Sequence, residues 1–424
     1  MGKNYDYDYI ILGSGPAGRA AAEGLSAAHK SVAIVEKSSF GGAEVNTRDL
    51  PFKIHLDFAR KLHDFSTSKA SGHSSCHFNL PTLIASRNVA ISKAKEAYAT
   101  TLALNHVKYY NGFAHFLDSN SIAVGEEELT AKNFILATGS ALKATEISGL
   151  TTTDYLTPET ALNLTRLPGY IFIIGGGKSG VELAEYFAML GCAVIIMERA
   201  SSLLPREDEE VSAAVEDYFV NELGITVVTN SKVVAISSDY SSKIVVFSSG
   251  SEEKMVRVDS IVLATGSEPT LDYGLENANV DFKRTGITVN KYFETSEKNI
   301  FAIGDCISSR DSSTERSLLE ARTLVSNLLH RQKSTADYTR LVREVHIRPA
   351  IATVGLNETD CLARDLKYKK EIINLNSIST ATGTSGFIKL LKNNSHHLLG
   401  ATIVTTDSTL AMSKLLNLII DKTF

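Results

Sequence analysis

Two sets of glycines in this sequence have the spacing that lets a polypeptide backbone approach a pyrophosphate. They are Gly13, Gly15 and Gly18 in the first set, and Gly175, Gly177 and Gly180 in the second. In each set the first glycine permits a tight turn, the second lets the backbone come close to phosphate, and the third allows close helix–strand packing. The helix N-terminus then offers unpaired N–H groups and a positive dipole end to an anion. Each set predicts a phosphate-binding turn.

A glutamate stands at the same distance beyond the last glycine of each set, Glu36 in the first and Glu198 in the second. A carboxylate there can accept hydrogen bonds from both hydroxyls of a ribose, which completes the pattern of a dinucleotide site. A carboxylate at this position would also repel a 2′-phosphate, so a nicotinamide dinucleotide bound beside Glu198 would be NAD(H) in preference to NADP(H). Arg199 beside it could offset this repulsion, so NADP(H) stays an alternative.

The elements that must position these residues are repeated in the sequence. Residues 8–36 and 170–198 each read as a buried strand, a glycine turn, an Ala/Leu-rich helix and a second apolar strand. A second repeat follows each copy, ILATGS at 135–140 and VLATGS at 262–267. A turn used only for packing would not require this duplication. The sequence therefore predicts an α/β fold with two Rossmann-like dinucleotide-binding domains.

Two further regions complete the expected architecture. Residues 299–305 read as a buried strand that ends at Gly304 and Asp305, and 315–330 as a helix. The Asp305 carboxylate could accept a hydrogen bond from a sugar hydroxyl or cap the following segment. Short alternating strands at 347–354, 386–391 and 400–404, and a last helix at 408–421, predict a C-terminal α+β domain.

Composition excludes several classes of function. The formal net charge of −5 gives no reason to expect a nucleic-acid partner. The cysteines form no CxxC pair, which argues against a zinc ribbon, a thioredoxin motif and a secreted disulfide framework; they are Cys76, Cys192, Cys306 and Cys361. Apolar runs are too short to cross a bilayer and the start is unlike a signal peptide, so we expect a cytoplasmic protein. No metal site is predicted, because His73, Cys76 and His77 have no partnering cluster.

With these motifs in place, the sequence resembles the pyridine nucleotide–disulfide oxidoreductases, the family of dihydrolipoamide dehydrogenase, glutathione reductase and mercuric reductase. The resemblance follows the chain in order through GGAEVNTRDLPFK at 41–53, ATGSEP at 264–269, AIGDC at 302–306 and RPAIATVG at 348–355. It implies that the first glycine set, with Glu36 and Asp305, holds FAD and that the second binds NAD(P)H. Other implied cofactor contacts are Gly41, Gly42, Lys53, Ala114, Thr138, Gly139, Gly304 and Gly266.

The family likeness also implies an organisation and a tuning pair. An FAD domain at 1–147 and 278–338 would be interrupted by an NAD(P) domain at 148–277 and followed by a shortened dimerisation domain at 339–424, giving a homodimer. Lys53 would lie near flavin N5 and pair with Glu182, where a cation would stabilise the negative charge of reduced flavin.

The sequence departs from the family where the redox disulfide should be. Glu44 and Asp49 occupy the positions of the two redox cysteines. Carboxylates cannot cycle between thiol and disulfide. One of them could have a raised pKa, or Arg48 could pair with one. One hypothesis is that Glu44 or Asp49 positions or protonates a substrate. The alternative is that these two carboxylates only interact with solvent or cap a helix. The chain also stops at Phe424, before the family's C-terminal His-Pro…Glu motif would be expected.

These features predict an FAD-dependent NAD(P)H oxidoreductase of the diaphorase type. Electrons would pass from NAD(P)H to flavin and on to a small-molecule or protein acceptor without a disulfide. A non-catalytic FAD/NAD sensor or assembly protein is the alternative, and a dihydrolipoamide-type disulfide reductase is the third reading. No acceptor is identified by any motif.

Overall fold

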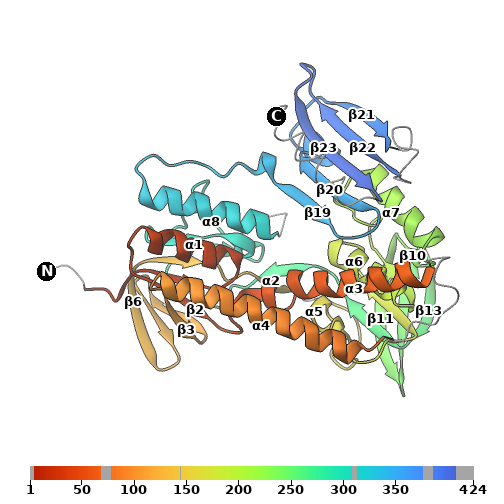
Figure 1. Cartoon of the computed structure of the whole chain (residues 1–424), viewed down its shortest axis with the longest axis horizontal. Helices are drawn as coiled ribbons and strands as arrows, with labels where there is room; N and C mark the ends of the chain where they lie inside the picture. Colours follow the sequence, from red (N-terminus) through yellow and green to blue (C-terminus); the bar gives the residue numbers. More distant parts are fainter. Residues whose placement is uncertain (1–3, 68–77, 144, 308–312, 376–384, 407–424) are drawn as a thin grey trace. The chain divides into compact units, whose positions relative to one another are not determined.

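The computed structural model of this chain describes residues 4–67, 78–143, 145–307, 313–375 and 385–406. The chain forms two compact units, shown in Figure 1. Unit 1 comprises Met1–Ile54, Thr82–Lys143 and Ser267–Asp337. Unit 2 comprises His55–Pro81, Ala144–Gly266 and Tyr338–Phe424. Unit 2 therefore combines the segments expected for NAD(P) binding and for dimerisation with residues 55–81. The three-domain division stays a prediction.

Unit 1 is built on a parallel sheet with the order β3-β2-β1-β6-β18, to which a hairpin adds two antiparallel strands. The inner strands are almost wholly buried, as expected of a parallel sheet covered on both faces. The strands are β1 (Tyr7–Leu12), β2 (Val32–Glu36), β3 (Lys108–Asn111), β4 (Ala114–Asp118), β5 (Ser121–Val124), β6 (Glu127–Leu136) and β18 (Ile300–Ala302).

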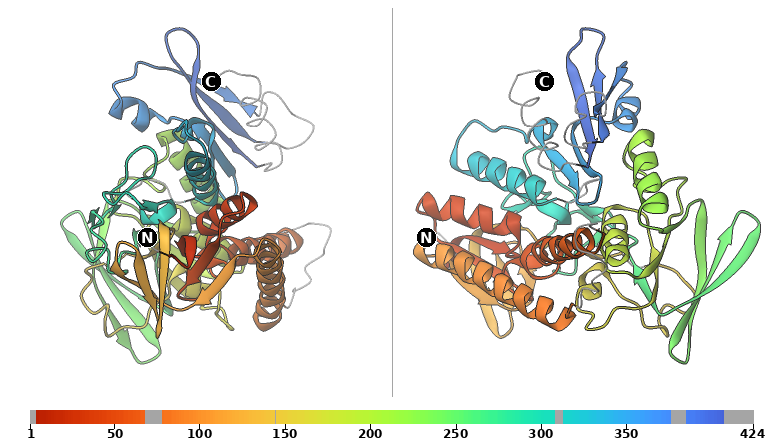
Figure 2. Two further views of the ribbon diagram at one scale, coloured as in Figure 1. Left: turned by 90° about the vertical axis from the view of Figure 1, so that its left-hand side faces the viewer. Right: turned by 45° about the vertical axis from the view of Figure 1, so that its right-hand side comes forward.

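Helices α1 (Pro16–Ala27) and α8 (Thr314–Leu329) pack side by side in unit 1, as Figures 1 and 2 show. Pro16 suits the first turn of α1, where its missing N–H costs no helical hydrogen bond. The Ala-rich face of α1 lets it lie close to the sheet. The remaining elements of this unit are α2 (Gly42–Asn46), β7 (Ser140–Leu142), β15 (Ser267–Pro269), β16 (Phe282–Lys283), β17 (Gly286–Ile287) and the short helix η2 (Gly304–Cys306). Helices α3 (Asp49–Thr67) and α4 (Leu80–Leu104) have residues in both units.

Unit 2 contains a second parallel sheet, with the order β10-β9-β8-β14, and an antiparallel sheet of β11, β12 and β13. Their elements are α5 (Pro158–Ala161), β8 (Tyr170–Ile174), α6 (Lys178–Met189), β9 (Ala193–Met197), α7 (Glu209–Asn221), β10 (Thr226–Val228), β11 (Ser231–Asp239), β12 (Ser242–Ser249), β13 (Glu252–Val258) and β14 (Ser260–Leu263). The two parallel sheets confirm the predicted α/β fold with two Rossmann-like units.

The C-terminal part of unit 2 is an antiparallel sheet with the order β19-β20-β23-β22-β21, drawn in blue in Figure 1. Its elements are η3 (Tyr338–Arg340), β19 (Val342–Val345), β20 (Ala350–Gly355), α9 (Glu358–Ala363), β21 (Lys369–Asn374), β22 (Gly386–Lys392) and β23 (Leu398–Thr405). The helix expected at 408–421 lies outside the described residues. Within the described part of the chain, no helix is both long and apolar enough to cross a membrane.

Candidate functional site

The first glycine turn connects β1 to α1 and has the shape that a pyrophosphate requires. A Cβ on Gly18 would lie 1.9 Å from the carbonyl oxygen of Gly13, so only glycine allows α1 to pack this closely on the turn. A Cβ on Gly15 would meet nothing within 4 Å. The turn therefore closes tightly behind Gly18 and leaves open space in front of Gly15, at the N-terminus of α1.

Glu36, at the end of β2, is held beside this turn by three hydrogen bonds. Its carboxylate accepts from the backbone N–H of Ser14 (2.9 Å), the Oγ of Ser14 (2.8 Å) and the N–H of Ser38 (2.9 Å). The Ser14 Oγ in turn accepts from the N–H of Gly41 (2.9 Å). Ser14 thus links the glycine turn, Glu36 and the start of α2 in one network.

The second glycine turn, between β8 and α6, repeats this geometry. A Cβ on Gly180 would lie 1.8 Å from the oxygen of Gly175, and one on Gly177 would meet nothing within 4 Å. Glu198 accepts from the N–H groups of Gly176 (2.7 Å) and Ala200 (2.8 Å). Both turns therefore leave room for a dinucleotide with its glutamate oriented toward the turn, and both fit the predicted cofactors.

The repeated ATGS segments lie against the two glycine turns. The N–H of Ala137 donates to the oxygen of Leu12, and that of Ala264 to Ile174, each at 2.8 Å. Thr138 and Gly139 therefore follow β6 directly beside the first turn, and the Thr138 Oγ1 donates to the oxygen of Thr270 (3.0 Å). Gly266 is exposed just after β14. Ala114, at the start of β4, is buried in the core of unit 1.

The end of β18 fixes Asp305 through α8. The N–H of Gly304 donates to Oε2 of the buried Glu320 (2.6 Å), and the Nε of Arg316 donates to Oε1 of the same carboxylate (2.7 Å). Asp305 accepts a hydrogen bond from the Ser140 Oγ at 3.1 Å. Burial raises the pKa of the neighbouring Cys306 thiol to about 11, in keeping with a packing residue and not a nucleophile.

Glu44 and Asp49, the two carboxylates predicted to stand at the redox-cysteine positions, have separate partners. Glu44, on α2, accepts from the Nη2 of Arg19 at 2.6 Å. Asp49, the first residue of α3, accepts from the Thr314 Oγ1 at 2.8 Å. The Nη1 of Arg48 donates to the Ser140 Oγ at 3.4 Å, so the cation that pairs with Glu44 is Arg19. None of the cysteines that the structure describes lies on α2 or α3.

Glu44 has an unusual electrostatic environment. Its side chain is only 20% exposed. Burial raises the pKa of Glu44, the Arg19 cation opposes that rise, and the charges of Asp49 and Glu315 add to it. A carboxyl group with a raised pKa can carry a proton nearer to neutral pH than an ordinary glutamate.

Arg19 itself is buried on α1, with a side chain 8% exposed. Its guanidinium lies over the ring of Tyr98, 3.5 Å from the ring centroid. The Arg19 Nε is buried and has no hydrogen-bond partner among the described residues. Arg19 is therefore held by one stack and one ion pair, and one of its donors is unused.

The predicted tuning residues belong to different units. Lys53 is exposed on α3 in unit 1. Glu182 is buried on α6 in unit 2, where it accepts from the N–H of His346 at 2.9 Å. The pairing of Lys53 with Glu182 stays a prediction.

The sequence did not identify four residues that complete the first site: Ser14, Arg19, Tyr98 and Thr314. Arg19 could have been found, because it is a cation directly after Gly18 in an Ala-rich helix. Thr314 could not, because it is far from Asp49 in sequence and belongs to no motif. His73, Cys76 and His77 lie outside the described residues. Within the described part of the chain, no group of three or more His, Cys, Asp and Glu side chains could hold a metal ion.

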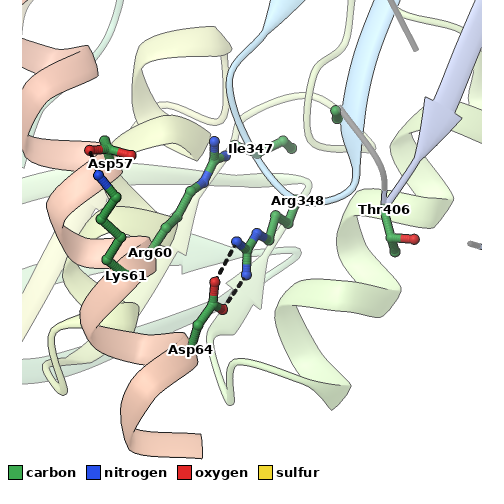
Figure 3. A pocket seen from close by; sticks show the side chains of 8 residues that line it. Asp57, Arg60, Lys61, Asp64, Ile347, Arg348 and Thr406 are labelled. Carbon is green, nitrogen blue, oxygen red and sulfur yellow. Dashed lines mark hydrogen bonds and ion pairs between the residues drawn. The ribbon is translucent and has the colours of Figure 1, made fainter. Parts of the chain in front are cut away.

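A cavity of about 260 Å³ lies elsewhere, in unit 2 (Figure 3). There Arg348 forms a two-pronged ion pair with Asp64, and Lys61 pairs with Asp57. None of the predicted site residues lines this cavity. Its lining residues are Asp57, Arg60, Lys61, Asp64, Ile347, Arg348, Ala350 and Thr406.

Comparison with known proteins agrees with this geometry. The sequence profile named Pyridine nucleotide-disulphide oxidoreductase matches residues 7–323. The chain belongs to this family. Members of the pyridine nucleotide-disulphide oxidoreductase family are FAD-dependent, which confirms the prediction of a flavoprotein oxidoreductase that binds FAD.

Individual members of the family align along most of the chain. Mercuric reductase of Streptomyces lividans is 31% identical over 399 residues, which cover 91% of this chain and 84% of that protein. Dihydrolipoyl dehydrogenase of Staphylococcus aureus is 29% identical over 421 residues, covering 96% and 89%. The Cu(II) complex of the HOCl-induced flavoprotein disulfide reductase RclA from Escherichia coli has a TM-score of 0.85 and 26% identity, covering 100% of this chain and 94% of that one.

Proposed function

We propose that this protein is an FAD-dependent NADH oxidoreductase that passes electrons directly to an acceptor, without a redox disulfide. The observation that carries the proposal is the pair Glu44 and Asp49, which stand where the family's reactive cysteines are expected. A carboxylate has no reversible two-electron chemistry, so an acceptor must take its electrons from the flavin itself.

The contacts of the two carboxylates support this reading. The disulfide would join these two positions covalently, whereas here Glu44 is bound to α1 through Arg19 and Asp49 to α8 through Thr314. The segment is thus anchored without a sulfur atom. A site that had lost its function would not need a buried ion pair at one of these positions, since such pairs contribute little net stability.

FAD, when bound, accepts a hydride from NADH and supplies two electrons to the acceptor. In this chain, the turn at Gly13–Gly18 would bind the pyrophosphate, Glu36 the ribose and Asp305 the ribityl chain. The exposed Lys53 would place a cation beside the reduced ring. The turn at Gly175–Gly180 would orient the hydride donor.

The preference for NADH rests on Glu198. Its carboxylate is oriented by the N–H groups of Gly176 and Ala200, where it can accept from a free ribose diol and would repel a 2′-phosphate. Arg199 is exposed beside it. We expect kcat/KM for NADH to exceed that for NADPH, and a clear preference for NADPH would contradict this part of the proposal.

The C-terminal sheet β19–β23 is proposed as a homodimer interface, following the family likeness. Sedimentation velocity of the purified protein tests it, with a dimer as the expected species and a monomer at micromolar concentration as the contrary result.

Stopped-flow spectroscopy tests the function itself. Anaerobic NADH should bleach the flavin within the time of a turnover, and an added acceptor should restore the colour. Alkylation of all accessible thiols should leave turnover unchanged. A flavin that stays yellow in NADH would favour the non-catalytic sensor, and turnover abolished by alkylation would restore a thiol mechanism.

A further inference from the structure

We propose that Glu44 is the acid that protonates the electron acceptor, and that Arg19, stacked on Tyr98, is the positioning residue that holds it. This inference rests on the proposed function and names the class of acceptor: a molecule that takes up protons together with electrons, such as a quinone.

The position of Glu44 follows from the contacts of α2 with the first glycine turn. The N–H of Gly41 donates to the Ser14 Oγ, which ties the start of α2 to the turn. A Cβ on Gly42 would lie 2.7 Å from the Cα of Gly15, so the two backbones touch. Glu44 follows two residues later on the same helix, at one of the two positions where the family likeness expects a redox cysteine and where the proposed function expects the acceptor to react.

Glu44 is better suited to acid chemistry than Asp49. Asp49 begins α3 and accepts a hydrogen bond from Thr314. Glu44 lies on the short helix α2, and its side chain is one-fifth exposed, so it can regain a proton from water. The charged groups facing Glu44 are Arg19 from α1, Asp49 from α3 and Glu315 from α8. Burial and the two carboxylates favour the neutral acid, whereas Arg19 favours the anion that remains after donation.

The contacts of Arg19 contribute little to the stability of the fold. A buried ion pair is weak evidence of stability, and the buried Nε has no hydrogen-bond partner in the described part of the chain, which is unfavourable for folding. Stacking on Tyr98 does, however, restrict the plane of the guanidinium. A restricted donor that grips one carboxylate oxygen fixes the orientation of the other, which is what a general acid requires.

The electrons and protons balance for a quinone. Reduction of a quinone to a hydroquinone takes up two electrons and two protons. FAD, when bound, would supply a hydride equivalent, and the Glu44 carboxyl would supply the second proton. Glu44 is left as a carboxylate paired with Arg19 and regains its proton from solvent. The sum is NADH + H⁺ + quinone → NAD⁺ + hydroquinone.

Two acceptors with different proton needs test this role. 1,4-Benzoquinone needs protons on reduction, whereas ferricyanide accepts single electrons and needs none. Glu44→Gln keeps the size of the side chain and an oxygen for Arg19. We expect the ratio of benzoquinone to ferricyanide turnover to fall by at least about tenfold in this variant, since general acids contribute about 10²–10⁴-fold. Arg322→Met, at an exposed position on α8, is the matched control and should leave the ratio unchanged.

Arg19 is tested by the pH profile of benzoquinone turnover. Because Arg19 lowers the pKa of Glu44, Arg19→Met should raise that pKa and shift the alkaline limb of the profile to higher pH, whereas Arg19→Lys should keep it near the wild-type position. An unchanged ratio in Glu44→Gln, or an equal fall with both acceptors, would overturn the inference. A wild-type protein that reduces neither acceptor would instead overturn the proposed function.

Discussion

The crossings β1–α1–β2 and β8–α6–β9 have the same backbone arrangement and differ in the side-chain contacts of their glycine turns. In both, a Cβ added to the third glycine would lie within 2 Å of a backbone carbonyl oxygen. In both, a glutamate accepts a hydrogen bond from a backbone N–H of the turn. In the first, that position is Ser14, whose hydroxyl adds a bond to Glu36 and reaches Gly41. In the second it is Gly176, where a Cβ would lie 2.6 Å from Leu203.

We propose that this difference suits the two turns to different cofactors. The first turn is joined to the segment that carries Glu44, so its cofactor would be held in register with that segment. The second turn has no such connection, and its glutamate is less buried than Glu36. The first arrangement suits a resident cofactor, and the second suits one that enters and leaves at each turnover.

Removing the close approach in each crossing should give the largest effects. Gly18→Ala forces a Cβ to 1.9 Å from backbone, so we expect the loss of most bound FAD, by at least about tenfold. Gly180→Ala should keep the yellow colour and lose reduction by NADH. Absorbance of the purified proteins at flavin wavelengths and anaerobic bleaching measure the two outcomes.

Gly177→Ala is the control for that pair, because its Cβ meets nothing within 4 Å. It should leave Tm unchanged and raise the KM for NADH. Equal loss of FAD from the Gly18→Ala and Gly180→Ala variants would mean that the two crossings do not bind different cofactors.

The next largest effects are expected from replacing the two glutamates, Glu36 and Glu198. Glu36→Ala removes three hydrogen bonds and leaves the N–H of Ser14 buried without its acceptor, which should cost about 1–3 kcal/mol and weaken FAD retention. Glu198→Ala removes two bonds at a less buried site and should cost less. It should also reduce the NADH-to-NADPH preference roughly tenfold. Urea unfolding and kcat/KM ratios are the measurements, and a larger loss of stability in Glu198→Ala would reverse the ranking.

Unit 2 contains a buried glutamate, Glu185, paired with Arg60. We expect Glu185 to titrate near neutral pH. Burial raises the pKa of Glu185 from 4.5 to about 7, against the opposing charge of Arg60. Between these values the folded protein binds a proton that the unfolded chain does not. The stability of the folded protein should therefore fall as pH rises from about 4.5 to 7, by on the order of 3 kcal/mol.

Glu185→Gln should flatten this part of the Tm–pH curve. The Tm of the variant relative to that of the wild type should therefore increase toward pH 7. Arg322→Met again serves as the control and should retain the wild-type slope. A slope that is unchanged in Glu185→Gln would assign the titration to another group.

The smallest expected effect makes the first crossing resemble the second. Ser14→Ala removes the hydroxyl that joins Glu36 to Gly41, at a cost of about 1 kcal/mol, or roughly 2–4 °C in Tm. The variant should release FAD faster than the wild type. Unchanged FAD release on dilution would mean that Ser14 is not what joins α2 to the turn.

The sequence was sufficient for the fold because glycine spacing and strand patterns repeat locally. Gly13–Glu36 and Gly175–Glu198 could be read in this way, and so could the absence of cysteines at 44 and 49. The partners of the two carboxylates could not, because Thr314 and Tyr98 meet Asp49 and Arg19 only through tertiary packing. No local pattern encodes such meetings.

We propose that flavin is the sole redox centre of this protein. An anaerobic titration with NADH, followed by absorbance, counts the electrons that the protein stores. Full reduction by one equivalent of NADH per flavin, two electrons in all, is the predicted end point. An end point of two equivalents, or four electrons, would reveal a dithiol partner and contradict direct transfer.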